Sequence, residues 1–206
     1  MLDYSGFATK VQGLGPGSRV VLWVRGCTIG CPGCMTQDLW AKGQPRPIEP
    51  LAIELIRHLS TSDGLTISGG EPFQQARPIA ELINLLRAQL DLNVVCYSGF
   101  VWERLNREPE SRELLECIDV LIDGPYRKEA SNDKQWRGSD NQRAILLSEK
   151  AKTLGEFDIE NGDQRVLQLQ TLSDGGVRII GIPRRKDMEK LKALVTARGL
   201  HVKERE

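Results

Sequence analysis

Histidine, net charge and long apolar runs are all scarce in this sequence. The two histidines, His58 and His201, are too few and too far apart for a histidine-based metal site. Lys plus Arg and Asp plus Glu number 28 each, so no net charge attracts nucleic acid or an acidic membrane surface. The longest apolar run near the start is VVLWV, five residues long, so we expect no signal peptide, no membrane partner and a cytoplasmic protein.

The number and spacing of the cysteines are the most informative feature of the sequence about its chemistry. Five cysteines are an odd number in a chain with no expected export signal, which argues against a disulfide framework and favours metal or redox chemistry. Cys27, Cys31 and Cys34 fall together in the stretch VRGCTIGCPGCM. With so few histidines, any metal site here must depend mainly on sulfur.

Strands and helices are expected to alternate through most of the chain. Apolar, β-branched runs bounded by turn residues predict strands, and apolar residues at helical spacing predict helices between them. Repeated strand–helix–strand units imply a parallel sheet, whose functional residues lie beyond the carboxyl ends of the strands. The expected strands are 19–26, 65–70, 93–99 and 119–126, and the expected helices are 48–60, one beginning near Pro78, and a short one at 101–106.

The pattern changes from about Ser148 onward. Asn161-Gly162 lies between extended runs, residues 176–183 predict a further strand, and residues 187–199 predict an amphipathic helix closed by Gly199. We therefore predict a core domain over residues 1–147 and a C-terminal extension over residues 148–206 that packs on it.

Three kinds of site compete for the clustered cysteines. A structural zinc ion takes four ligands, and the other candidates, Cys96 and Cys117, are far along the chain. A thioredoxin-like pair would use Cys31 and Cys34 and leave Cys27 without a role. A [4Fe-4S] cluster held by three thiolates would keep its fourth iron open for a ligand.

A second motif favours the cluster. The spacing C-x-x-x-C-x-x-C resembles the signature of the radical S-adenosylmethionine (SAM) superfamily, and SGGEP at 68–72 resembles the motif with which those enzymes hold the methionyl amino group. The resemblance implies an α/β partial (β/α) barrel of mainly parallel strands. It implies a cluster on the three cysteines, SAM on the open iron, and reductive cleavage to a 5′-deoxyadenosyl radical. No catalytic residue is assigned beyond the cluster and the cofactor.

The likeness extends to one branch of the superfamily. CPGCM, YSGFVWERL, IDVLIDGPY and WRGSDNQR occur in the order found in anaerobic ribonucleotide reductase activating proteins, over roughly residues 15–147. Those proteins install a glycyl radical on a partner enzyme, so the resemblance implies such a partner and an electron donor such as flavodoxin or ferredoxin. The SAM contacts that it implies are Ser68, Gly69, Gly70 and Glu71, with Ser98 and Asp123 as candidates that could also be strand caps, while Trp136, Arg137, Asn141 and Gln142 could close the pocket or order a loop.

Several features leave the substrate open. Met35 and Thr36 stand where that branch usually has Tyr-Asn, Asp140 replaces a usual Ser, and the C-terminal extension exceeds an ordinary activating protein of this kind. Two alternatives therefore remain beside glycyl radical activation. One is a radical SAM enzyme that modifies a peptide or small molecule, and the other is a catalytically silent metal-binding module.

Overall fold

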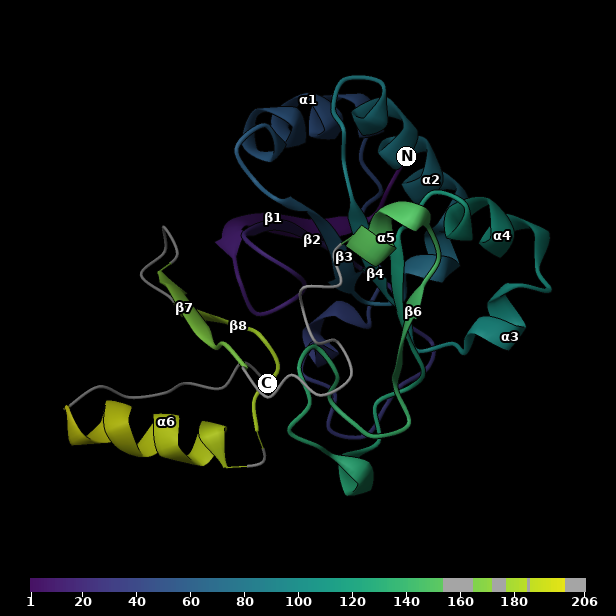
Figure 1. Ribbon diagram of the computed structural model, residues 1–206. Helices are drawn as coiled ribbons and strands as arrows, with labels where there is room; N and C mark the ends of the chain where they lie inside the picture. The colour runs from purple at the N-terminus through teal and green to yellow at the C-terminus, as the bar shows by residue number, and fades with distance from the viewer. Residues whose placement is uncertain (154–164, 172–176, 185, 199–206) are drawn as a thin grey trace.

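A six-stranded sheet forms the centre of the computed structural model, which describes residues 1–153, 165–171, 177–184 and 186–198 (Figure 1). Strands β2 to β5 run parallel, while β1 and β6 pair antiparallel at the two edges. The expected α/β fold of mainly parallel strands is confirmed, and the barrel is partial because the edge strands do not pair with each other. The bounds are β1 (Tyr4–Val11), β2 (Arg19–Val24), β3 (Gly64–Gly69), β4 (Val94–Tyr97), β5 (Val120–Asp123) and β6 (Arg143–Leu146).

Parallel pairing brings the carboxyl ends of β2 and β3 level. The register runs from Arg19 beside Gly64 to Val24 beside Gly69. The cysteine loop after β2 and the glycine turn after β3 therefore start side by side, and β4 and β5 continue the parallel arrangement. All four predicted strands are present, so the sequence motifs at their ends meet at one edge of the sheet.

Helices cover one face of this sheet (Figure 1). In β2, alternation directs Val20, Leu22 and Val24 into the core beneath the helices, while Val21 and Trp23 face the other way. The expected second helix begins at Ala76, slightly before Pro78; a proline in the first turn costs no intrahelical hydrogen bond. The helices are α1 (Ile48–Leu59), α2 (Ala76–Arg87), α3 (Trp102–Leu105) and α4 (Pro109–Leu115).

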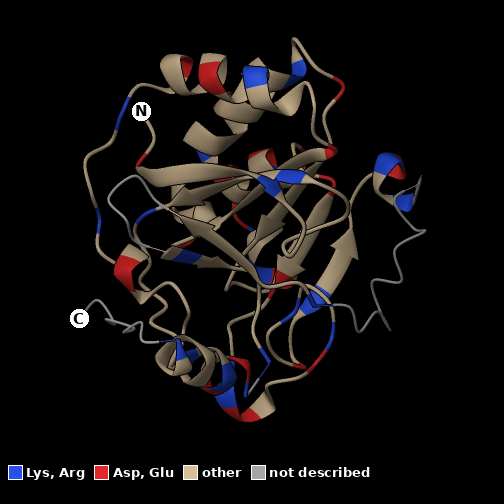
Figure 2. Ribbon diagram, turned by 90° about the vertical axis from the view of Figure 1, so that its left-hand side faces the viewer, with Lys and Arg blue, Asp and Glu red and all other residues tan. Residues whose placement is uncertain are grey.

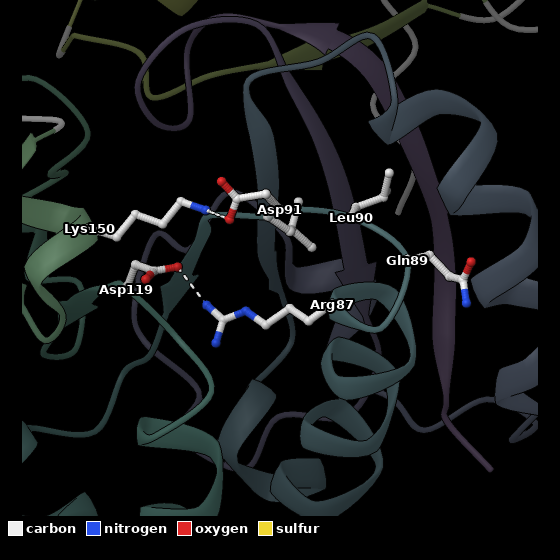
Figure 3. A pocket seen from close by; sticks show the side chains of 7 residues that line it. Arg87, Gln89, Leu90, Asp91, Asp119 and Lys150 are labelled. Carbon is white, nitrogen blue, oxygen red and sulfur yellow. Dashed lines mark hydrogen bonds and ion pairs between the residues drawn. The ribbon is translucent and has the colours of Figure 1, made fainter.

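Asp119 joins several elements at the amino ends of β4 and β5. Its buried carboxylate accepts hydrogen bonds from the backbone N–H of Val94 (2.7 Å) and from the Ser148 hydroxyl (2.6 Å). It also pairs with the Arg87 guanidinium at 2.8 Å, as Figure 3 shows. This end of the sheet lies opposite the cysteine loop. Asp119 therefore serves the fold, and a substitution there tests stability without touching the cysteine loop.

The two edge strands were not predicted. β1 is interrupted by Gly6 and by register shifts before and after the middle of the strand, and only Ala8 and Val11 in it are buried, so its sequence lacks a continuous apolar pattern. β6 is only four residues long and half exposed. Both strands are defined by their pairing with β2 and β5, which is a tertiary contact.

The C-terminal extension contributes a hairpin and a helix. β7 (Gln168–Thr171) pairs antiparallel with β8 (Val177–Ile180), and α6 (Asp187–Ala197) follows, after the short α5 (Glu149–Thr153). The strand expected within 176–183 and the helix from Asp187 are confirmed. Asn161-Gly162 and Gly199 lie outside the described residues, and the domain boundary at 147/148 stays a prediction.

Charge is mixed over the surface rather than separated. Basic and acidic residues alternate over the helices and loops in Figure 2, including α6. This agrees with the equal numbers of both signs in the sequence. Among the described residues, no helix is long and apolar enough to span a bilayer.

Candidate active site

The cysteine loop leaves β2 and is held at its base by backbone hydrogen bonds. The N–H of Gly26 donates to the carbonyl of Leu39 at 2.9 Å, and the N–H of Cys27 donates to the carbonyl of Trp40 at 2.9 Å. These acceptors belong to or follow the short helix η1 (Gln37–Leu39), which closes the loop. Inside the loop, Gly33 has a φ of 78°, a left-handed conformation that favours glycine and turns the chain before Cys34.

Cys27, Cys31 and Cys34 line one pocket together with the glycine turn after β3. The three thiols are half-buried and none is in a disulfide. The structure thus brings together the three predicted cluster cysteines. The other residues that line this pocket are Ile29, Trp40, Ser68, Gly69, Gly70, Glu71, Tyr97, Ser98, Gly99, Gly124, Tyr126 and Gln142.

The glycine turn packs directly against the base of the cysteine loop. The N–H of Gly70 donates to the carbonyl of Val24 (2.9 Å), and the N–H of Glu71 donates to the carbonyl of Gly26 (2.8 Å). A Cβ atom added at Gly70 would lie 2.4 Å from the Gly26 oxygen, so no side chain fits there. The Thr36 hydroxyl also donates to the Gly69 carbonyl, at 2.9 Å, so the far end of the cysteine loop is fixed to the same turn.

The Glu71 carboxylate connects β3 to β4 from a buried position. It accepts hydrogen bonds from the N–H of Phe73 (3.0 Å), the hydroxyl of Ser98 (2.9 Å) and the N–H of Gly99 (2.7 Å). Phe73 lies in the short helix η2 (Pro72–Gln75). Burial outweighs these bonds and raises the pKa of Glu71 to about 7. The side chain therefore orders the turn, since all three donors belong to the protein.

Ser98 and Asp123 occupy different positions, although both were predicted as SAM contacts. Ser98 lines the pocket beside Glu71. Asp123 is fully buried, and its carboxylate accepts hydrogen bonds from the N–H of Trp102 (2.7 Å) and from the Arg143 guanidinium (3.0 and 2.5 Å). Asp123 does not line the pocket; its neighbour Gly124 does. A direct contact of Asp123 with SAM stays a prediction that this geometry does not favour.

The loop of residues 131–142, which contains the sequence WRGSDNQ, reaches the pocket through one side chain. Gln142 lines the pocket, and its amide nitrogen donates to the carbonyl of Gly124 at 3.0 Å. Asn141 donates to the carbonyl of Pro125 at 2.7 Å, on the strand-end segment that also carries Tyr126. Trp136 and Arg137 are buried away from the pocket lining. Gln142 thus fits the predicted role in closing the pocket, and Asn141 fits the predicted role in ordering the loop.

Several pocket residues were not singled out from the sequence. Tyr97, Gly99, Gly124 and Tyr126 all follow or end parallel strands, so the rule that placed the glycine turn at a strand end applies to them too. Trp40 lies just past η1 and has no such signal. Its position depends on the backbone bond between Cys27 and Trp40, which only the folded loop makes.

The donor set of the pocket fits an iron–sulfur cluster. Partial burial raises the pKa of the Cys31 thiol, and the nearby Cys34 and Cys27 add to this, so a bound cation is needed to hold three thiolates together. Among the described residues, no three Cys, His, Asp or Glu side chains are arranged to hold a single metal ion. A cluster places each cysteine on a different iron, so its sulfurs surround the cluster rather than converge on one ion. Cys96 and Cys117 lie outside the pocket, which leaves a four-ligand zinc site incomplete.

Comparison with known proteins agrees with this assignment. A family model described as a 4Fe-4S single cluster domain matches residues 13–145. That stretch contains the three cysteines and the Gly-Gly-Glu turn. The chain belongs to this family. It is a radical SAM enzyme whose cofactors are a [4Fe-4S] cluster and SAM.

Several relatives of this radical SAM enzyme are named anaerobic ribonucleoside-triphosphate reductase-activating protein. The enzyme is 38% identical to that of Enterobacteria phage T4 over 136 residues, covering 63% of this chain and 84% of the relative. It is 29% identical to that of Escherichia coli K12 over 137 residues (62% and 88%) and 31% identical to that of Vibrio cholerae over 137 residues (62% and 87%). Among solved structures, QueE from Escherichia coli matches with a TM-score of 0.44 and 17% identity, covering 97% of this chain and 92% of QueE.

Proposed function

We propose that this enzyme cleaves SAM reductively and uses the resulting radical to activate a glycyl radical enzyme such as an anaerobic ribonucleotide reductase. The observation that carries the proposal is the shared pocket of Cys27, Cys31, Cys34 and the Gly-Gly-Glu turn. The names of the relatives support the class of partner, since the chain covers 84 to 88% of their lengths. An external electron donor such as flavodoxin or ferredoxin completes the proposal.

The bound cofactors supply the redox chemistry. When bound, the reduced cluster would supply the electron that cleaves the C5′–S bond of SAM and releases methionine, and a glycine Cα of the partner would supply the hydrogen atom that completes 5′-deoxyadenosine and leaves the glycyl radical. In this proposal the thiolates of Cys27, Cys31 and Cys34 bind three irons. The three thiols line the pocket on a loop that hydrogen bonds fix at both ends, which would hold the cluster at the pocket.

The glycine turn and the strand ends would hold SAM. Without side chains, Gly69 and Gly70 pack directly against the backbone of Val24 and Gly26, so the turn that would hold the amino group of SAM lies beside the cysteine loop. Glu71 keeps this turn in place through its three donors. Ser68 would offer its hydroxyl group to the polar parts of SAM, and Ser98, whose hydroxyl donates to Glu71, would offer only an acceptor oxygen. Such pre-arranged contacts restrict the cofactor to one orientation, which a radical reaction requires for selectivity.

Anaerobic cleavage of SAM tests the cofactor part of the proposal. After reconstitution with iron and sulfide, the full-length protein should bind four irons per chain, as a [4Fe-4S] cluster requires. With dithionite and SAM it should release 5′-deoxyadenosine and methionine in equal amounts. A fully loaded cluster that yields no 5′-deoxyadenosine would refute the enzyme and favour a silent metal-binding module.

A pair of cysteine variants provides the matched control. Cys31→Ala removes a pocket thiol and should lose the cluster and all cleavage of SAM. Cys117→Ala removes a thiol that contacts Asn84 outside the pocket, so its iron content and cleavage rate should match the wild type within about twofold. Equal iron content in the two variants would contradict the assignment of the cluster ligands.

Formation of a glycyl radical tests the partner. Mixing the reduced enzyme and SAM with an anaerobic ribonucleotide reductase should produce the doublet signal of a glycyl radical in electron paramagnetic resonance (EPR) spectra. Deuterium at the glycine Cα of the partner should appear in 5′-deoxyadenosine. Cleavage of SAM without transfer from glycine, but with deuterium transfer from a labelled peptide or small molecule, would favour the alternative radical SAM function.

A further inference from the structure

The described part of the C-terminal extension attaches at one end to the first strand of the sheet. The side-chain amide of Gln168 on β7 accepts a hydrogen bond from the N–H of Gln12 (2.7 Å) and donates one to the carbonyl of Lys10 (2.9 Å). Lys10 lies in β1 and Gln12 directly follows it. Gln168 therefore acts as an added partner for the backbone at one edge of the sheet.

The middle of the extension packs on the face of the sheet opposite to α1, α2 and α4. Ile180 on β8 is 3% exposed and joins the apolar cluster that contains Val21 and Trp23 of β2. The Arg178 guanidinium lies 5.2 Å from the ring centroid of Trp23. The contacts of Ile180 and Arg178 exclude water from this face of the sheet and fix the β7–β8 hairpin across it.

Arg165, three residues before Gln168, attaches the extension to the 131–142 loop. Its half-buried guanidinium donates to the carbonyls of Lys134 (2.9 Å) and Arg137 (2.6 Å) and to the side-chain oxygen of Asn132 (2.8 Å). It also donates to the carbonyl of Pro183 at 3.0 Å, which lies just after β8. One planar cation thus joins three points of the loop to the extension, and a lysine could not reproduce this fork of donors.

From Arg165 the chain of contacts continues into the cofactor pocket. Arg137 is followed by Gly138 and Ser139, whose N–H groups both donate to the Gln142 side-chain oxygen, at 2.8 and 3.2 Å. The Gln142 amide nitrogen donates to Gly124, and both residues line the pocket. A Cβ atom at Gly138 would lie 3.0 Å from the ring of Tyr126, so the loop also fixes this pocket residue by close packing.

We propose that Arg165 is a positioning residue for the SAM site, through which the C-terminal extension completes a wall of the cofactor pocket. By holding residues 132–137, Arg165 keeps Gln142 and Tyr126 at the pocket edge. The inference rests on the proposed function, because it assigns SAM as the ligand of that pocket. It also extends the site beyond residues 13–145, the stretch that matches the family model.

The test uses the full-length, cluster-loaded enzyme and three variants. Arg165→Ala removes all the loop contacts, Arg165→Lys keeps the charge but lacks the fork, and Arg198→Ala removes an arginine at the exposed end of α6 as the matched control. Hydrogen–deuterium exchange of a peptide covering residues 131–142 reports on the loop without SAM. Titration of SAM against the EPR spectrum of the reduced cluster gives the dissociation constant.

The expected result links the loop to the cofactor. Arg165→Ala should exchange at 131–142 at least tenfold faster and bind SAM at least tenfold more weakly, with iron content equal to the wild type. Arg165→Lys should give values between those of Arg165→Ala and the wild type, and Arg198→Ala should match the wild type in both measurements. Should Arg165→Ala fail to fold, Arg165→Lys alone decides, with an expected change of at least threefold in both quantities.

Two outcomes would overturn the inference. One is unchanged exchange at 131–142, which would show that Arg165 does not hold the loop. The other is faster exchange with SAM affinity within twofold of the wild type, which would show that the loop is no part of the site. If the wild-type spectrum does not respond to SAM at all, the proposed function fails instead, and the exchange experiment still tests the Arg165 contacts separately.

Discussion

Replacing Glu71 with glutamine should change how stability depends on pH. Burial raises the pKa of Glu71 from 4.5 to about 7, so the folded protein binds this proton more tightly than the unfolded chain does. The stabilisation by the bound proton is complete below the unfolded pKa and is lost as the pH rises through the folded pKa. Glutamine has nearly the same shape and does not titrate, so Glu71→Gln removes this one contribution.

The size of the effect follows from the two pKa values. At about 1.4 kcal/mol for each pKa unit, the wild type should lose about 2–3 kcal/mol of unfolding free energy relative to Glu71→Gln between about pH 5 and about pH 8. Most of this change should fall between the unfolded and folded pKa values, with a plateau above about pH 7.5. Groups that titrate equally in both proteins cancel in the difference.

Urea denaturation measures the difference in unfolding free energy between the wild type and Glu71→Gln at intervals across the pH range. The proteins are cluster-free and kept reduced, and unfolding is followed by circular dichroism. The slope of unfolding free energy on urea concentration should be the same for both proteins, which shows that the same structure unfolds. A difference between wild type and Glu71→Gln that stays constant from about pH 5 to about pH 8 would show that burial does not dominate the ionisation of Glu71. The three protein donors would then keep the carboxylate charged throughout.

Two further substitutions test the packing of the pocket and the fold separately. Gly70→Ala places a methyl group 2.4 Å from the Gly26 oxygen and should weaken SAM binding at least tenfold, measured by EPR titration; unchanged binding would show that the turn relaxes freely. Asp119→Ala leaves the N–H of Val94 and the Ser148 hydroxyl without their acceptor and should lower the unfolding free energy by about 3 kcal/mol in urea denaturation. Its SAM affinity, once refolded and reconstituted, should equal that of the wild type, and a tenfold loss would contradict the separation of the two ends of the sheet.

The sequence alone was sufficient to predict the central architecture and the short loop that carries the three cysteines. β2 is apolar without interruption from Val20 to Val24 and β3 is mostly apolar, which is typical of strands buried on both faces, and the helices between strands have a clear apolar stripe. Cys27, Cys31 and Cys34 are close in the chain, so their covalent spacing already limits how far apart they can lie. Short-range patterns of this kind need no knowledge of distant contacts.

Tertiary structure alone decided which polar strand-end residues reach the pocket. Ser98 and Asp123 end or follow neighbouring strands and looked equivalent, but Arg143 and the N–H of Trp102 take up the Asp123 carboxylate. The partner arginine lies on β6, a strand that no local pattern revealed. A side chain is committed to a distant partner only when the chain folds, so its availability to a ligand cannot be inferred from its own position in the sequence.

The same reason explains why the sequence did not reveal the role of the C-terminal extension. From the sequence it was a set of strands and a terminal helix packed on the core without an assigned role, because nothing near Arg165 or Gln168 signals the residues that they contact. Those contacts join residues far apart in the chain, Gln168 to Lys10 and Arg165 to Asn132, and they exist only after the sheet has formed. Local sequence thus determined the parallel strands, the helices between them and the cysteine motif, whereas the pocket wall depends on side-chain pairings that only the folded sheet brings within hydrogen-bonding distance.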